Sequence, residues 1–369
     1  MRGGRGERLY ALVEAYAALG DHRTGTPVDE ATRDWFAQET ERRDGVVESI
    51  SYGFDQYVAN VRVTVEGREL HVAPLFYSGV GEVDSVVPFI AEVDATVGGT
   101  GPDDALGMAR ALGFRVAVLA TSGITGQLIG INRTPSQPPG PIAVLAPGEE
   151  IDALRRGPVH VTVDARVVPG TSATVVGRFA SKNAPKKRST GTTPVVITTP
   201  LTGWFGCAGE RGTGIAVALE LAIDLSADQP VVLIATTGHE IGFIGMHDYL
   251  ARSEIDACAV LQLGASVAAT ERNGEELRFA LIDHVDAELD ARLDAALEPS
   301  RFRTVRHEGP WPTEGDGWRV HGVPVVSYVG FFDRFHTPAD VPDAVTSPAF
   351  LEAVTGALLD AARLVIPLT

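Results

Sequence analysis

The chain is poor in the residues that would link it to a nucleic acid, an oxidising compartment or a membrane. Two cysteines, Cys207 and Cys258, occur among 369 residues, which is too few for a disulfide framework and fits a reducing compartment. The net charge is -17, so the sequence has no basic excess to displace counterions from a nucleic acid. No stretch approaches the ~20 apolar residues that span a bilayer. We expect a cytoplasmic protein with neither nucleic acid nor membrane as a partner.

Apolar sequence is present in the amount that a large core requires. Hydrophobic residues make up 44% of the chain, and this length accommodates one large domain and a smaller one. Near the N-terminus, Glu14 interrupts the apolar stretch 9–19, which predicts an amphipathic helix rather than a secretory signal. The oligomeric state stays open.

The first 164 residues change in pattern partway along. Helical spacing over 7–19 and 28–43 is followed by alternating apolar residues over 46–52 and 58–65, which predicts two helices and then two strands paired with each other. Residues 70–164 contain short apolar strands, one helix and a proline-rich loop. We interpret this segment as an inserted, mostly β domain.

Beyond residue 164, apolar strands alternate with amphipathic helices. This pattern is typical of an α/β domain with a central mixed, mostly parallel sheet that helices cover on both faces. The predicted domain is discontinuous, from residues 1–69 and 165–369, and its ligands are expected where strands end. The elements expected after the first core strand, 195–197, cover 213–224, 231–236, 241–252, 258–264, 277–282, 285–297, 323–329 and 347–365.

Three short motifs follow one another along this alternation. Gly212-Thr213-Gly214 opens a helix, Gly238-His239-Glu240-Ile241-Gly242-Phe243-Ile244-Gly245 follows a strand, and His336-Thr337-Pro338-Ala339-Asp340 lies far downstream. In this order they resemble the zinc aminopeptidases of metallopeptidase family 28, which includes the glutaminyl cyclases. The insert resembles the protease-associated domain that many of these enzymes carry. The resemblance covers most of the chain and implies an aminopeptidase-like α/β sandwich.

The resemblance also implies metal ligands, and several of those positions hold other residues. Thr199 and Leu201 correspond to the family's first zinc-binding His and its orienting Asp, and Gln262 corresponds to a later Asp ligand. A shift of one residue would place Thr198 at the first position instead. Thr and Gln are poor zinc ligands and Leu is none. Glu314 stands in a segment where the family has Ser-Asp-His.

Three donors are retained for a second metal. Glu210 corresponds to the bridging Asp, Glu240 to the next carboxylate ligand, and His336 to the final His. Three ligands with an open position suit a catalytic zinc, and the glutaminyl cyclase branch uses such a single-metal site. His239 replaces the family's catalytic Glu and would act as general base or acid. The resemblance therefore implies one zinc per chain at most, or none.

The same residues also suit other roles. Glu210 would pair with Arg211 or cap the helix that follows it, and Glu240 would cap the helix expected at Ile241. Cys207 would be a nucleophile with His239 as its base, or a buried structural cysteine. Two aromatic residues in loops near the expected cleft would line a pocket beside Cys207: Trp204 and Phe335.

Three functional hypotheses follow. The first is a divergent hydrolase of the aminopeptidase family, with a single metal at most, that acts on a peptide or small amide. The second is a catalytically inactive pseudo-peptidase that binds a ligand or partner. The third is a metal-free biosynthetic enzyme that uses His239 or Cys207. Ordinary two-zinc aminopeptidase activity is not expected, because four residues of that constellation are replaced.

Overall fold

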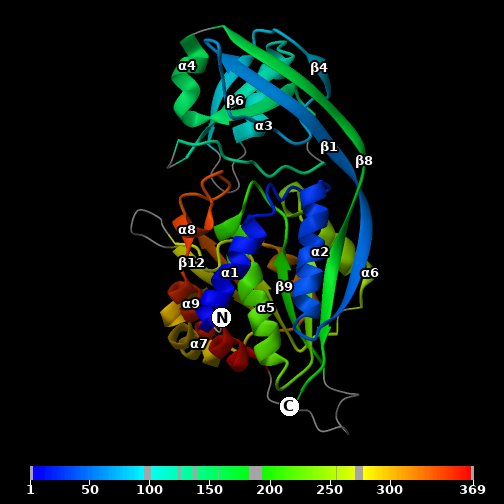
Figure 1. Ribbon diagram of the computed structural model, residues 1–369, viewed down its shortest axis with the longest axis vertical. Helices are drawn as coiled ribbons and strands as arrows, with labels where there is room; N and C mark the ends of the chain where they lie inside the picture. The colour runs from blue at the N-terminus through cyan, green and yellow to red at the C-terminus, as the bar shows by residue number, and fades with distance from the viewer. Residues whose placement is uncertain are drawn as a thin grey trace.

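Two β-sheets organise the chain in the computed structural model, which is drawn in Figure 1. It describes residues 3–94, 101–123, 126–135, 139–156, 158–182, 193–254, 256–270 and 277–366. The larger sheet has ten strands in the order β13-β12-β14-β11-β9-β10-β8-β1-β2, with β4 paired to β8. The smaller sheet has four strands and lies at the top of Figure 1.

The centre of the larger sheet is parallel. Strands β10 (Val231–Thr236), β9 (Val195–Pro200), β11 (Ala259–Leu263) and β14 (Val325–Phe331) run in one direction side by side. Antiparallel strands flank them on both sides. The predicted fold class, an α/β domain with a mixed, mostly parallel central sheet, is confirmed. The remaining strands of this sheet are β12 (Leu277–Asp283), β13 (Arg303–Val305), β8 (Val159–Phe179), β1 (Val46–Val65), β2 (Arg68–Glu69) and β4 (Gly81–Val83).

Helices cover both faces of this sheet because its central strands are apolar on both sides. Val195 and Ile197 of β9 pack in one core with helices from both ends of the chain, and Val196 packs in a second core on the opposite face. None of the described helices is long and apolar enough to cross a membrane. The first face carries α1 (Arg5–Ala17), α2 (Pro27–Glu41), α5 (Thr213–Leu225), α7 (Asp290–Leu297) and α9 (Pro348–Val365), and the second carries α6 (Ile244–Arg252) and η6 (Glu314–His321).

A long antiparallel ribbon joins the two sheets. Strand β1 (Val46–Val65) has 20 residues, and each of them pairs with β8 (Val159–Phe179). The expectation that 46–52 and 58–65 pair with each other is wrong, because residues 53–57 continue the same ladder and no turn separates the two halves. Figure 1 shows the ribbon curving from the lower body to the upper one.

The upper body contains helices as well as strands. Its sheet has the order β3 (Ala73–Pro74), β7 (Ile142–Pro147), β6 (Val116–Ser122) and β5 (Phe89–Asp94), and the last three strands are parallel. Helices α3 (Gly101–Ala111) and α4 (Ile151–Arg156) belong to the same segment. The predicted boundaries of the insert fall just beyond the end of β1 and within β8, and they stay predictions.

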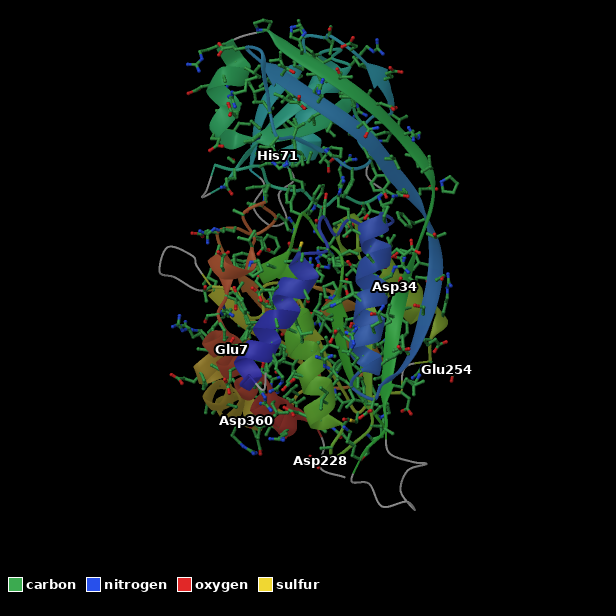
Figure 2. All side chains as sticks on the ribbon, viewed as in Figure 1. Glu7, Asp34, His71, Asp228, Glu254 and Asp360 are labelled. Carbon is green, nitrogen blue, oxygen red and sulfur yellow. The ribbon has the colours of Figure 1, made fainter. Side chains whose placement is uncertain are left out.

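The negative charge of the chain is displayed at its surface. Figure 2 labels five acidic residues of the lower body, and all five are exposed. They are Glu7, Asp34, Asp228, Glu254 and Asp360. The carboxylates described next differ from these, because they are buried.

Candidate active site

Polar side chains gather where the parallel strands end. Thr199 lies next to the end of β9, Thr236 ends β10, and Gln262 lies next to the end of β11. Ligands of parallel α/β sheets bind at this edge. We call the following six buried residues the polar centre: Glu210, Arg211, His239, Glu240, Glu314 and His336.

Glu210 lies between two basic side chains. It belongs to η2 (Ala208–Gly212), a π-helical turn ahead of α5. Its Oε1 is 2.5 Å from Nη2 of Arg211 and 3.0 Å from Nε2 of His336. Burial alone would raise the pKa of Glu210, but these two neighbours outweigh burial and lower it to about 2. The predicted pairing with Arg211 is confirmed, and no side chain caps α5.

Arg211 places a guanidinium in the polar centre without any exposure to solvent. Its Nε donates to the carbonyl of Thr202 at 3.0 Å, and its Nη2 forms the ion pair with Glu210. Neither Nη1 nor Nη2 has a hydrogen-bond partner among the described residues, although Nη2 lies in the ion pair. The planar group is thus held at Nε and Nη2, while Nη1 forms no hydrogen bond with the described residues.

His336 is fixed from both sides of its ring. Its Nδ1 lies 2.9 Å from the carbonyl of Gly130, in the upper body, and its Nε2 faces Glu210. Both ring nitrogens of His336 thus lie at hydrogen-bond distance from oxygen atoms of the chain itself. The ring of Phe335 stacks on it at 4.0 Å. The backbone of His336 has φ +59°, a left-handed conformation that clusters at functional sites in non-glycine residues.

Glu240 is bonded elsewhere. One carboxylate oxygen accepts from the backbone N–H of Thr24 at 2.6 Å, and the other accepts from the hydroxyl of Thr202 at 2.9 Å. Burial raises the pKa of Glu240 against these bonds. Glu240 does not cap a helix at Ile241, because α6 begins only at Ile244, after residues with positive φ.

His239 and Glu314 form a second pair. Nδ1 of His239 lies 3.2 Å from Oε1 of Glu314, whose other oxygen accepts from the hydroxyl of Thr236 at 2.6 Å. Burial, together with the nearby charge of Arg211, lowers the pKa of His239 well below its ordinary value, so the imidazole is neutral. Burial raises the pKa of Glu314 to about 7. A neutral imidazole oriented by a carboxyl group is chemically able to accept a proton.

The three positions at which the resemblance implied a zinc ligand or its orienting Asp lie at the same edge of the sheet. Thr199 is buried, and its hydroxyl has no partner among the described residues. Leu201 belongs to the hydrophobic core. The carbonyl oxygen of Gln262 accepts from Ser327, while its Nε2 has no partner within the described ranges. None of these three side chains supplies a good zinc donor.

The three predicted pocket residues differ in exposure. The thiol of Cys207 is fully buried, donates to the carbonyl of Trp204 at 2.7 Å, and has a pKa raised well above its ordinary value by burial. Trp204 packs into the core of the upper body, 4.7 Å from the ring of Phe76. Phe335 is partly exposed beside His336. A buried thiol with a raised pKa is a poor nucleophile at neutral pH.

The residues of the polar centre do not fit a catalytic zinc. The structure brings Glu210 and His336 together but directs Glu240 to Thr24 and Thr202. Throughout the described part of the chain, no group of three or more His, Cys, Asp or Glu side chains is placed to hold a metal ion. Arg211 lies against the Glu210 oxygen that also faces His336, so a cation of the protein itself already neutralises this carboxylate.

The fold of the chain is that of solved zinc aminopeptidases. A zinc aminopeptidase from Bacillus subtilis matches with a TM-score of 0.72 and 15% identity, over 97% of this chain and 94% of its own. An aminopeptidase from an Aneurinibacillus species matches with a TM-score of 0.65 and 19% identity, over 99% and 96%. A family 28 peptidase precursor from Shewanella amazonensis gives 0.73 and 15%, over 98% and 94%. Neither a family model nor a curated protein matches the sequence.

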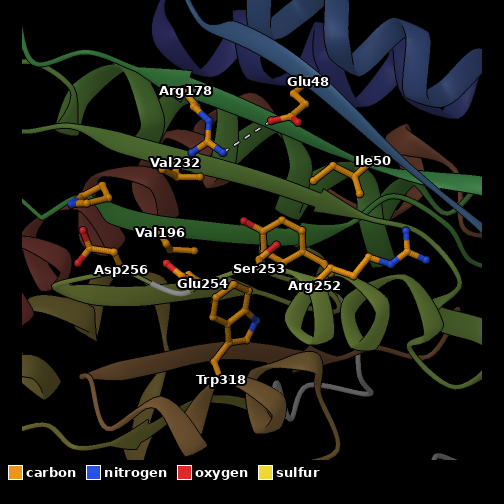
Figure 3. A pocket seen from close by; sticks show the side chains of 12 residues that line it. Glu48, Ile50, Arg178, Val196, Val232, Arg252, Ser253, Glu254, Asp256 and Trp318 are labelled. Carbon is orange, nitrogen blue, oxygen red and sulfur yellow. Dashed lines mark ion pairs between the residues drawn. The ribbon is translucent and has the colours of Figure 1, made fainter.

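A hollow of about 530 Å³ lies away from the polar centre. Figure 3 shows it, with Val196 and Val232 among its lining residues and the ion pair of Glu48 and Arg178 at one side. The two valines lie near the amino ends of β9 and β10, whereas the polar centre lies at the carboxyl ends. The hollow is therefore not the site that the fold positions for ligands.

Sequence reasoning missed several residues that shape the centre. Thr24 and Gly130 contribute through the backbone, and no motif marks either of them. Thr202 bonds to both Glu240 and Arg211, and its place shortly after a core strand was the available signal. Arg211 was considered as a partner of Glu210 but not as a replacement for a metal. Its direct adjacency to Glu210 was the signal.

Proposed function

We propose that this chain is a pseudo-peptidase of the aminopeptidase fold, which binds a peptide or small amide at the carboxyl ends of the central strands without zinc. One observation carries the proposal. The buried guanidinium of Arg211 forms an ion pair with the carboxylate of Glu210. The carboxylate of Glu240 instead accepts hydrogen bonds from Thr24 and Thr202. A protein cation of this kind makes a zinc unnecessary for charge balance and leaves too few donors to hold one.

Metal content and peptidase assays test this proposal together. We expect the purified, zinc-supplemented chain to hold no stoichiometric zinc by elemental mass spectrometry, and to release no leaving group from aminoacyl anilides with or without a chelator. About one zinc per chain that is lost in Glu240→Ala would overturn the proposal and support the single-metal hydrolase instead.

A second candidate is metal-free hydrolysis of a peptide or small amide. The contact of 3.2 Å between His239 and Glu314 favours it, because an imidazole that donates Nδ1–H to a carboxylate keeps Nε2 as a base for a water molecule. Arg211 would stabilise the oxyanion that forms. Chelator-resistant hydrolysis that is abolished in His239→Gln would support this candidate. The alternative with Cys207 as nucleophile has no comparable support, because its thiol is buried with a raised pKa.

A further inference from the structure

Buried donors and hydroxyls near the strand ends lack partners among the described residues, and so does one acceptor, Oδ1 of Asp333 just beyond β14. Four of the side chains that carry these donors and hydroxyls are almost fully buried. Buried polar groups are normally hydrogen-bonded, and leaving one unpaired lowers stability. An unpaired donor at the ligand-binding edge of a sheet therefore indicates that something else pairs with it. The atoms are Oγ1 of Thr198, Oγ1 of Thr199, Nη1 of Arg211 and Nε2 of Gln262; Nη2 of Arg211 also lacks a hydrogen bond but forms the ion pair with Glu210. Thr198 and Thr199 are consecutive in β9 and face opposite sides of the sheet, so Arg211 carries the argument that follows.

The four carboxyl groups at the same place already have partners. Glu210 contacts Arg211 and His336, Glu240 accepts from Thr24 and Thr202, and Glu314 accepts from Thr236 and faces His239. Both oxygens of Asp340 accept backbone N–H groups, from Gly209 at 2.6 Å and from Glu210 at 3.1 Å. An incoming ammonium group would find none of these four carboxyl groups unshared.

We propose that the polar centre binds the carboxylate of a small ligand and that Arg211 selects for it. The proposal rests on the zinc-free function proposed above and names its ligand class. It reverses the polarity of an aminopeptidase site, because an aminopeptidase acts on a substrate with a free amino group. Guanidinium and amide N–H groups are the donors that recognise carboxylates in proteins.

Arg211 is oriented for this role before any ligand arrives. Its Nε is held by the carbonyl of Thr202 and its Nη2 by Glu210, so Nη1 is fixed in direction. A side chain that is already immobile loses little entropy on binding. Glu210 also contacts His336, so its negative charge is shared between two basic groups and repels an approaching anion less.

The partly exposed residues of the centre indicate the rest of the ligand. The side chains of His239 and His336 are 10% and 8% exposed, whereas those of Arg211, Glu210 and Glu314 are fully buried. Aromatic rings lie beside both imidazoles, Phe243 at 4.6 Å from His239 and Phe335 at 4.0 Å from His336. A ligand that enters past them would bring a carboxylate attached to an apolar group, such as an N-acylated apolar amino acid or the C-terminal residue of a peptide.

Two probes with the same side chain and opposite charge test the proposal. We would titrate the full chain calorimetrically with N-acetylleucine, which has a carboxylate and no amine, and with leucinamide, which has an amine and no carboxylate. We expect N-acetylleucine to bind at least about tenfold more tightly. Tighter binding of leucinamide, or no binding of N-acetylleucine, would overturn the proposal. Leucinamide would also report an ammonium site at Asp333, whose buried Oδ1 has no partner in the described ranges.

Variants assign the binding to the named residues. Arg211→Met should weaken N-acetylleucine at least about tenfold, and Arg252→Met, which removes an exposed arginine on α6, should leave it unchanged. If Arg211→Met does not fold, Thr199→Val decides: it should raise the melting temperature without ligand and weaken N-acetylleucine. Unchanged affinity in the folded variants would overturn the proposal.

The metal content of the same samples separates this inference from the proposed function. Stoichiometric zinc would refute the zinc-free function, while the preference between the two probes and its dependence on Arg211 would still decide the ligand class. Absence of zinc together with a preference for leucinamide would retain the zinc-free function and overturn the ligand class.

Discussion

The guanidinium of Arg211 lies 2.5 Å from the carboxylate of Glu210, and neither side chain is exposed to solvent. A carboxylate that is buried this deeply needs a cation nearby, because an isolated charge is very costly to remove from water. The neighbouring residue in the sequence supplies that cation, so the local fold can be stable without a metal ion.

Removing this cation should be costly. We expect Arg211→Met to lower the free energy of unfolding by about 3–5 kcal/mol, since it leaves Glu210 buried and less compensated. Adding Glu210→Gln should recover a large part of the loss. Arg252→Met is the matched control, because its ion pair with Asp248 is partly exposed and is worth under about 1 kcal/mol. Urea denaturation of the four proteins measures this, and an Arg211→Met loss as small as the control's would contradict it.

Glu240 provides a test between a structural role and a metal-binding role. Glu240→Ala would leave the N–H of Thr24 and the hydroxyl of Thr202 without their acceptor, so we expect a loss of about 2 kcal/mol or more. Glu240→Gln keeps one acceptor oxygen and an amide group and should recover most of that stability. Metal content should be equal in all three proteins. If Glu240→Gln lost a bound metal without losing stability, Glu240 would be a metal ligand rather than a structural residue.

Much of the fold could be predicted because its signals are local. Apolar strands alternate with amphipathic helices over the second half of the chain, and this pattern predicted the parallel centre of the sheet. The ribbon of β1 and β8 was missed, because its pairing joins residues far apart in the sequence, from Val65 with Val159 to Val46 with Arg178. Alternation alone does not identify such a partner. Helix α6 begins later than predicted, since Gly242 and Phe243 adopt positive φ.

The polar centre was less predictable than the fold. Residue types at family positions predicted that Glu210 and His336 meet, and they do. The orientation of Glu240 depends on the backbone of Thr24, which is distant in sequence and carries no motif. The importance of Arg211 depends on its complete burial. The sequence Glu210-Arg211-Gly212 does not predict that burial, because charged residues are usually exposed. Contacts that use backbone groups leave no trace in residue type.

The stability of the chain should depend on pH through Glu314. Burial raises the pKa of this carboxyl to about 7, whereas a glutamate in an unfolded chain titrates near ~4.3. Between these values the folded state binds the additional proton, so this contribution to stability is complete below about pH 4 and is lost as the pH rises to about 7.

Glu314→Gln isolates this contribution. We expect its free energy of unfolding, relative to the unsubstituted chain, to rise by up to about 1.4 kcal/mol per pH unit across that window and to level off above it. Denaturation at several pH values from about 5 to about 8 measures the difference. The same difference at every pH would show that Glu314 has an ordinary pKa in the folded state.

The upper body contacts the polar centre through Gly130, and this contact can be disturbed selectively. The N–H of Gly130 donates to the carbonyl of His336 and its own carbonyl faces the ring of the same histidine, both at 2.9 Å. A Cβ atom at Gly130 would lie 2.2 Å from the ring of Trp204. We therefore expect Gly130→Ala to displace this loop and to lower the free energy of unfolding by about 1–3 kcal/mol.

Gly107→Ala is the matched control, because a Cβ atom at Gly107 meets nothing within 4 Å. Gly107 also lies in helix α3, where alanine is favoured over glycine by up to about 1 kcal/mol. Hydrogen exchange at the backbone of residues 129–133 and of His336 should accelerate in Gly130→Ala and stay unchanged in Gly107→Ala. Equal exchange in the two variants would show that the upper body does not hold His336 in place.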